Sequence, residues 1–218
     1  HARNPKKILL KLFESFLSRG GSFKRLNVNK VNFLSDDKLS IETNSDSYNF
    51  DKMVIACGAF SKKLTDQAGE KIPLDTERGY HVHFKGHDHL LSRPVIFLNR
   101  GFGITPMEQG LRVVGTVEFG GLDNPPSKKR ITNLVNNAKY LFPELEKHED
   151  EWLGFRPTLP DFLPVIGPSK KYKNLFYSFG HHHLGWTLGA ISGKIIAGMV
   201  ANEKTNLNLS PYNSLRFS

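Results

Sequence analysis

Helices are predicted wherever apolar residues recur every three or four positions along the chain. One such pattern covers residues 5–19 and ends at two glycines. A second covers residues 128–142 and ends at a proline, which cannot continue a helix. A third begins near Trp186 or Thr187, with small residues along its length. A shorter helix is expected over residues 61–69.

Short apolar runs separated by turn residues predict strands of two kinds. Residues 52–56 and 174–179 are apolar through their centres, which is typical of strands covered on both faces. Each run is followed by small residues, so we expect both in one sheet with Gly58 and Gly180 at the same edge. The remaining runs predict antiparallel strands, and they cover residues 22–33, 39–43, 48–50, 79–84, 94–99, 103–106, 111–118 and 151–156.

The order of these elements predicts a mixed α/β fold. Residues 1–69 and 151–205 are expected to form an α/β layer with a partial Rossmann-like sheet. An antiparallel sheet with one helix, residues 70–150, interrupts it. Residues 206–218 are expected to be a C-terminal tail, a turn is expected at residues 35–37, and the proline-rich residues 159–168 are expected to be irregular.

Composition narrows the class of protein. Hydrophobic residues make up 39% of the 218 positions, enough for a packed core. The formal net charge is +9, but the lysines are scattered in small groups beside turns, which favours a solvated surface over nucleic-acid binding. The single cysteine, Cys57, excludes an internal disulfide and favours a reducing, cytoplasmic compartment, with the inner face of a membrane as the alternative. We expect Cys57 to be a small buried residue.

The histidine-rich stretches could suggest a metal site. However, neither residues 181–183 nor the histidines between 81 and 89 are completed by a cysteine or carboxylate at metal-ligand spacing. Zinc is therefore disfavoured. In the strand at residues 79–84, His81 and His83 share one face and Tyr80 and Val82 the other, so only one pair can face a site.

Residues 180–203 combine a strand end, a glycine-punctuated loop and a helix N-terminus. This arrangement aims backbone N–H groups and the positive end of a helix dipole at one spot. An anion, or an electron-rich carbonyl of a flat cofactor, would be held there. An ordinary strand–helix crossover with a glycine turn would give the same pattern.

Four segments, taken together and in this order, resemble the FAD-dependent amine oxidoreductases, a group that includes D-amino-acid dehydrogenase, glycine oxidase, D-amino-acid oxidase and sarcosine oxidase. They are VIACGAFS at residues 54–61, TPMEQGLRVVGTVE at 105–118, GFRPTLPDFLPVIG at 154–167 and the GHHHLGWT loop with its helix at 180–193. The resemblance runs from residue 1 to about residue 203 and is nearest to the dehydrogenase branch.

The resemblance implies FAD as the cofactor, and oxidative deamination of an amino acid or amine by hydride transfer from the substrate α-carbon to flavin N5. It implies that Arg156 pairs with the substrate carboxylate and that Tyr80 and His181 contribute to substrate binding. The implied cofactor-binding residues are Ala56, Gly58, Gly180, His182, His183, Leu184, Gly185, Trp186 and Thr187. The electron acceptor stays open between oxygen, a quinone and an electron-transfer protein.

The sequence departs from this group in two ways. A GxGxxG turn between a strand and a helix, which would hold the FAD pyrophosphate, does not occur in it. His182 also stands where relatives often have glycine. Because the first residue is His1, we expect a C-terminal fragment of the enzyme, which alone binds FAD weakly or not at all and self-associates through an exposed sheet edge. The alternative is a non-catalytic remnant or subunit that binds a partner or a small carboxylate without flavin.

Overall fold

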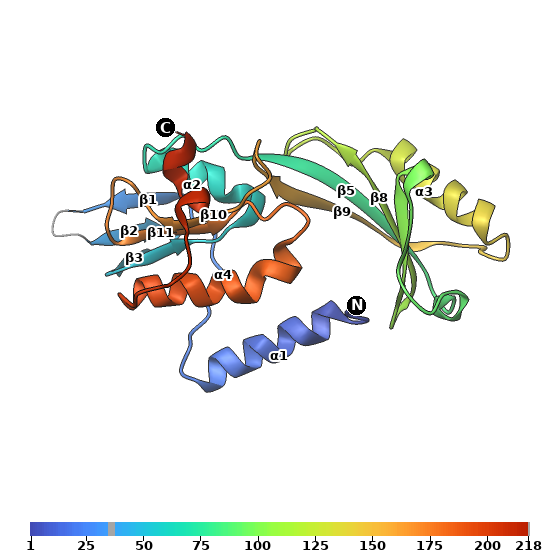
Figure 1. Ribbon diagram of the computed structural model, residues 1–218, viewed down its shortest axis with the longest axis horizontal. Coiled ribbons are helices and arrows are strands. Elements are labelled where there is room, and N and C mark those ends of the chain that lie inside the picture. Colours follow the sequence, from blue (N-terminus) through green and yellow to red (C-terminus); the bar gives the residue numbers. More distant parts are fainter. Residues whose placement is uncertain (35–37, 218) are drawn as a thin grey trace. The chain divides into compact units, whose positions relative to one another are not determined.

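The structure is a computed structural model that describes residues 1–34 and 38–217. It separates into two compact units, and Figure 1 labels several elements of each. Unit 1 consists of residues 1–25 and 78–154, and unit 2 of residues 26–77 and 155–218. The expected mixed α/β class is confirmed. None of the described helices is long and apolar enough to cross a membrane.

Unit 2 is organised by a sheet of strand order β10-β11-β4. Strand β4 (Met53–Ile55) runs parallel to β11 (Leu175–Phe179), with Met53 opposite Leu175. The prediction that these two runs share a sheet is confirmed. Because the strands are parallel, Gly58 and Gly180 follow them at the same edge, also as predicted.

The third strand of this sheet corrects a prediction. Strand β10 (Val165–Pro168) pairs antiparallel with β11, although residues 159–168 were expected to be irregular. The prolines misled that expectation. An edge strand tolerates proline because only one side of it donates to a neighbour, and β10 lies at the edge of the sheet.

Both faces of β11 are covered, as its apolar centre predicted, whereas the same prediction is wrong for β4, where Val54 is 37% exposed. Leu175, Tyr177 and Phe179 point into one core, which includes α2 (Ser61–Gln67) and the preceding strands of the unit. Phe176 points to the opposite face and packs with Ile196 of α4 (Gly185–Val200). Helix α4 thereby lies against β10 and β11 with its N-terminus next to the carboxyl end of β11.

A small antiparallel meander completes the sheets of unit 2. It consists of β1 (Lys30–Phe33), β2 (Leu39–Glu42) and β3 (Ser47–Phe50) in that order, as expected. The turn predicted at residues 35–37 lies outside the described residues. A short 3-10 helix, η2 (Gly58–Phe60), connects β4 to α2.

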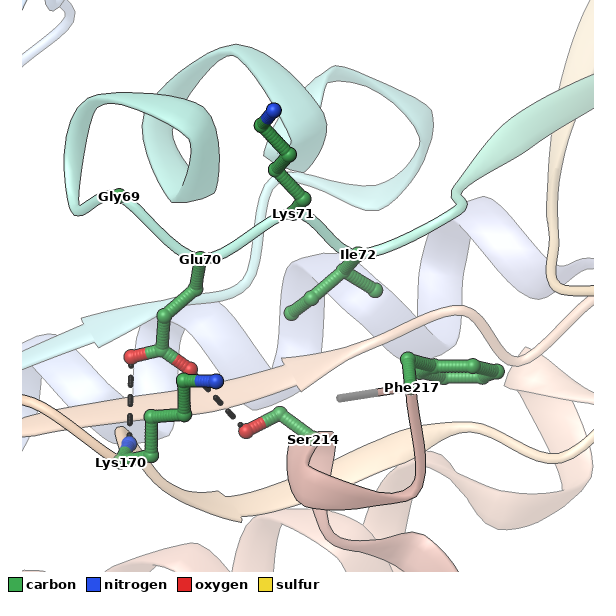
Figure 2. Close-up of a pocket in the computed structure, with 7 residues that line it drawn as sticks. All are labelled: Gly69, Glu70, Lys71, Ile72, Lys170, Ser214 and Phe217. Atoms are coloured by element: carbon green, nitrogen blue, oxygen red, sulfur yellow. Dashed lines mark hydrogen bonds between the residues drawn. The ribbon is translucent and has the colours of Figure 1, made fainter.

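The C-terminal residues belong to unit 2 and are not a separate tail. The 3-10 helices η5 (Ser210–Tyr212) and η6 (Ser214–Phe217) follow α4. Figure 2 shows Glu70, only 3% exposed, accepting hydrogen bonds from the Ser214 hydroxyl at 3.1 Å and the Lys170 backbone N–H at 3.2 Å. The Tyr177 hydroxyl also donates to Glu70, at 3.0 Å, as does the Ser169 hydroxyl.

A pocket of about 270 Å³ lies beside Glu70 (Figure 2). Its lining residues are Gly69, Glu70, Lys71, Ile72, Lys170, Ser214 and Phe217. The Glu70 carboxylate is already surrounded by donors from three parts of unit 2. We therefore assign it a structural role, which is to hold η6 against the β10–β11 hairpin.

Unit 1 contains a five-stranded sheet of order β6-β7-β8-β5-β9. Its strands are β5 (Asp75–Phe84), β6 (Val95–Phe97), β7 (Phe102–Met107), β8 (Gly110–Glu118) and β9 (Glu149–Thr158). The first three residues of β5 and the last four of β9 extend into unit 2. Two 3-10 turns, η3 (Asp88–Leu90) and η4 (Leu98–Arg100), flank β6.

One face of this sheet is covered by α3 (Lys128–Leu141). Tyr80, Val82 and Phe84 of β5 point to that face, where Leu134 and Ala138 of the helix meet them. His81 and His83 lie on the other face, as the strand parity predicted.

Helix α1 (Pro5–Ser18) belongs to unit 1, although it was expected with the α/β layer of residues 1–69. Polar contacts explain the difference. Arg3 pairs with Asp88 at 2.7 Å, and Glu108 accepts from Asn4 at 2.9 Å and pairs with Lys7. The units divide at residues 25–26, 77–78 and 154–155.

The role of Glu70 gives a testable prediction. Glu70→Ala leaves four donors without their acceptor, three of which are buried hydroxyls, so we expect the free energy of unfolding to fall by about 3 kcal/mol. Urea denaturation at pH 7 measures it. Glu146→Ala, at an exposed position, serves as the control and should change the value by less than about 0.5 kcal/mol. Equal unfolding midpoints for the two variants would contradict the assigned role.

Candidate functional site

The site predicted at the N-terminus of α4 starts from a loop with two unusual backbone positions. Gly180 has a φ of 82°, and a Cβ at this position would lie 2.5 Å from Leu159 Cδ1, so only glycine fits. His182 also has a left-handed φ, 52°, and its backbone N–H donates to the Pro157 carbonyl at 2.9 Å. This bond ties the loop to the end of β9.

Helix α4 then begins with free donors. Leu184 is the N-cap residue, and among the described residues no side chain caps this helix end. The first backbone N–H groups of an α-helix lack intrahelical acceptors, which here are those of Gly185, Trp186 and Thr187. The Trp186 side chain is 51% exposed. The helix end can therefore donate to an electron-rich group, and its dipole favours negative charge there.

The side chain of His181 contacts α4, the helix that follows its loop. Its Nε2 lies 2.8 Å from the Ser192 hydroxyl of α4, and burial lowers the pKa of His181. The imidazole therefore holds the loop against the helix as a neutral group. Contact between His181 and a substrate stays a prediction.

His182 forms a buried pair that the sequence did not reveal. Its Nε2 lies 2.7 Å from Glu77 Oε2, and the two side chains are 11% and 9% exposed. The ring of Phe162 packs edge-on against the His182 ring at 5.1 Å. Glu77 is the third residue of β5. It lies more than one hundred positions before His182 in the chain. No signal in the local sequence could have identified Glu77, because its neighbours Thr76 and Arg78 are polar as well.

Arg156 shares this surrounding. It is half-buried on β9, and burial lowers the pKa of its guanidinium while the Glu77 carboxylate raises it. The pKa of His183 is lowered by burial, by His182 and by Arg156, and Glu77 opposes that decrease. The structure thus brings Arg156, His182 and His183 together around Glu77.

The other predicted cofactor residues gather at one edge of the unit 2 sheet. Ala56 and Gly58 follow β4, and Gly180 follows the parallel strand β11. Gly58 has a φ of 55°, which turns the chain into η2. Cys57, between them, is exposed, so the prediction that it is buried is wrong. Strand β4 ends at Ile55, and the chain has already left the covered part of the sheet at Cys57.

Tyr80 lies in unit 1 and has a structural role there. It is fully buried, and its hydroxyl donates to Glu118 at 2.5 Å and accepts from the Ser127 backbone N–H at 3.0 Å. Arg78, 1% exposed, lies 3.3 Å from Glu118 and donates to the Pro125 carbonyl at 2.9 Å. These hydrogen bonds and ion pairs hold β5 and β8 against the turn before α3. Contact between Tyr80 and a substrate stays a prediction.

His81 and His83 lie on the sheet face opposite α3. The rings of His81 and Trp152 stack at 4.8 Å. Burial lowers the pKa of His81 to about 4, helped by the nearby His83 and Arg112. Among residues 1–34 and 38–217, no group of three or more His, Cys, Asp or Glu side chains is arranged to hold a metal ion.

Comparison with known proteins identifies the class to which these features belong. Residues 1–199 match the model of the DAO family, described as FAD dependent oxidoreductase. The chain belongs to this family of FAD-dependent oxidoreductases, and FAD is the cofactor that the family implies. The donor set at the helix N-terminus fits such a cofactor, because a row of uncapped N–H groups suits the carbonyl edge of its ring.

Particular relatives are also similar. D-amino-acid oxidase of Bradyrhizobium diazoefficiens is 30% identical over 220 residues, covering 99% of this chain and 52% of the relative. D-amino acid dehydrogenase of Vibrio vulnificus is 31% identical over 184 residues, covering 82% of this chain and 44% of the relative. The crystal structure of glycine oxidase from Geobacillus kaustophilus is similar with a TM-score of 0.81 and 25% identity, covering 90% of this chain and 54% of that one. The chain therefore spans about half the length of the relatives it matches.

The low pKa of His81 gives a prediction about pH. The folded state keeps His81 neutral down to about pH 4, whereas the unfolded chain binds a proton near the ordinary pKa of 6.5. Stability from this group is therefore fully present above pH 6.5 and is lost as the pH falls from 6.5 towards 4. His81→Gln should flatten this part of the pH dependence of the free energy of unfolding. Imidazole NMR of the folded chain checks the premise, and a His81 midpoint near pH 6.5 would refute it.

Proposed function

We propose that the protein to which this chain belongs is an FAD-dependent enzyme that oxidatively deaminates an amino acid or a related amine. The observation that carries the proposal is the position of Arg156 beside the loop that leads into the uncapped N-terminus of α4. The relatives are named as an amino-acid oxidase, an amino acid dehydrogenase and a glycine oxidase, which supports the same reaction class.

Arg156 is proposed to bind the substrate carboxylate. A guanidinium presents two parallel N–H donors to a carboxylate, which fixes both the position and the orientation of the ligand. Half-burial strengthens such a pair because less water competes with it. The substrate α-carbon would then be held at a defined distance from the carboxylate anchor.

The first turn of α4 is proposed to hold the carbonyl edge of the cofactor through Gly185, Trp186 and Thr187. FAD, when bound, supplies the acceptor for the electron pair that leaves the substrate α-carbon. The protein contributes the positive end of the helix dipole, which stabilises negative charge at that edge. Ala56, Gly58 and Gly180 are proposed to leave room for the cofactor at the edge of the sheet.

A second candidate is a non-catalytic subunit that binds a partner without flavin. The exposed edge strand β4 favours it, since Val54 is 37% exposed and β4 has only β11 as a neighbour among the described strands. An open, apolar edge of this kind supports self-association or pairing with another chain. A visible absorption spectrum of the purified protein separates the candidates, because only a flavoprotein absorbs near 450 nm.

The role of Arg156 gives the next prediction. In the intact enzyme, Arg156→Ala should lower kcat/KM for the amino-acid substrate by an amount equivalent to roughly 3–5 kcal/mol, because an ionic anchor is lost. Flavin content should stay unchanged. The measurements are steady-state kinetics and the flavin absorbance of the purified variant.

Arg93→Ala is a matched control, since Arg93 is exposed on a loop of unit 1. It should leave kcat/KM unchanged. If Arg156→Ala behaved like Arg93→Ala, another group would have to bind the carboxylate.

A further prediction concerns cofactor affinity. The 218-residue chain offers donors to the ring end of FAD but contains no glycine-rich turn of the GxGxxG type for the pyrophosphate. We expect binding of FAD to this chain to be weak or absent. Titration of FAD followed by flavin fluorescence tests this, and stoichiometric binding at micromolar concentration would show that the main anchor lies elsewhere.

A further inference from the structure

The pair of Glu77 and His182 is unusual because it buries a carboxylate, which costs free energy, and because His182 has a left-handed backbone conformation. Burying a carboxylate is unfavourable unless a charged or hydrogen-bonded partner compensates it, and the imidazole at 2.7 Å is that partner. His182 reaches Glu77 from a left-handed backbone conformation, which non-glycine residues rarely adopt. Strain of this kind at a ligand-binding loop points to a functional reason for the side chain.

The second ring nitrogen of His182 contacts the neighbouring histidine, which lies at the surface. Its Nδ1 is in hydrogen-bond contact with Nδ1 of His183, which is exposed. Glu77 accepts, so His182 carries its proton on Nε2 and its Nδ1 is an acceptor. His183 then donates through Nδ1, and its Nε2 keeps a free lone pair. The result is a chain from a buried carboxylate through one imidazole to a second imidazole that accepts protons at the surface.

Charges around this chain come from three elements. Glu77 is on β5, Arg156 on β9, and both histidines are in the loop before α4. Arg156 and Glu77 influence the pKa of His183 in opposite directions. A proton taken up by the imidazoles would therefore be stabilised by the carboxylate of Glu77, and the site would hold one anionic and two cationic groups.

The proposed reaction needs a group that accepts a proton from the substrate. An amino acid in neutral solution carries an ammonium group, and its nitrogen lone pair is available to form a C=N bond only after a proton has left. A base within hydrogen-bond reach of that nitrogen accelerates this step when its own proton affinity is suitable. If Arg156 holds the carboxylate, the ammonium group of the same α-carbon lies within a few ångströms of it.

We propose that Glu77, His182 and His183 form a proton-accepting chain that deprotonates the substrate ammonium group. This inference rests on the proposed function and adds a base to it. The substrate N–H bond breaks, and its proton forms a bond to His183 Nε2. The electron pair of the N–H bond stays on nitrogen as the lone pair. The nitrogen lone pair is then available to form the C=N bond, for which FAD, when bound, would accept the Cα–H electron pair as a hydride. His183 is the catalytic residue in this step, and His182 and Glu77 are positioning residues.

The first arm of the test does not depend on activity. Imidazole ¹⁵N NMR of the chain should show His182 protonated on Nε2 at pH 7. Glu77→Gln removes the carboxylate charge that raises the pKa of His183, so the titration midpoint of His183 should move down by about one pH unit. An unchanged His183 midpoint in Glu77→Gln would overturn the proposal.

The second arm uses the intact FAD-loaded enzyme. His183→Gln should slow flavin reduction by the amino acid at least about tenfold at pH 7. The rate should recover towards the wild-type rate near pH 10, where the substrate amine loses its proton without help. His89→Gln, at an exposed histidine of η3, is the matched control and should keep the wild-type pH profile.

The outcomes separate the two claims. A His183→Gln enzyme with the wild-type rate and profile overturns the proton-accepting chain while the proposed function stands. A slow rate that does not recover at high pH also overturns it, because the defect would then lie in geometry and not in deprotonation. A wild-type protein whose flavin no amino acid reduces overturns the proposed function itself.

Discussion

The parallel pairing of β4 with β11 is the constraint on which the candidate site depends. Parallel strands end at the same edge of a sheet, so the pairing of Met53 with Leu175 brings the turns after both strands to one place. Neither turn makes a site alone. Because Phe176 also anchors α4 through Ile196, the same strand fixes where the helix N-terminus lies. The sheet therefore supplies an edge with small residues and a helix end with free donors.

Three buried or half-buried carboxylates show how different surroundings give different roles. Glu70 is surrounded by hydroxyl and backbone donors, and Glu118 by Arg78, Tyr80 and Arg130. In both cases the partners keep their protons at neutral pH, so the groups hold the structure together. Glu77 differs because its partner is an imidazole, whose ordinary pKa lies close to neutrality.

The sequence predicted the parts of the fold that depend on local pattern. The apolar centres of β4 and β11 and the helical spacing of α1, α3 and α4 each depend on neighbouring residues, and those elements are present. Strand β10 was missed because the three prolines of residues 159–168 outweighed its apolar residues. Only Pro168 lies in the strand, and a sheet edge tolerates it. The position of α1 was missed because it depends on ion pairs with residues about one hundred positions away.

The same limit applies to the candidate site: residues in local motifs could be predicted, and those brought in from distant parts of the chain could not. Arg156 and the α4 loop lie in recognisable motifs, whereas Glu77 belongs to a strand whose neighbours, Thr76 and Arg78, are polar as well. Nothing in the local pattern separates a carboxylate that pairs with a distant histidine from one that faces water. The pairing of Glu77 with His182 becomes visible only in the folded chain, where the end of β9 and the α4 loop lie beside the start of β5.

The most direct test of the account is a crystal structure of the intact protein with FAD and an unreactive carboxylate bound. The account predicts that the carbonyl edge of the flavin ring accepts hydrogen bonds from backbone N–H groups of Gly185, Trp186 or Thr187. It also predicts that the carboxylate forms a two-bond pair with the guanidinium of Arg156. A flavin ring bound away from the α4 N-terminus, or a carboxylate bound without Arg156, would contradict it.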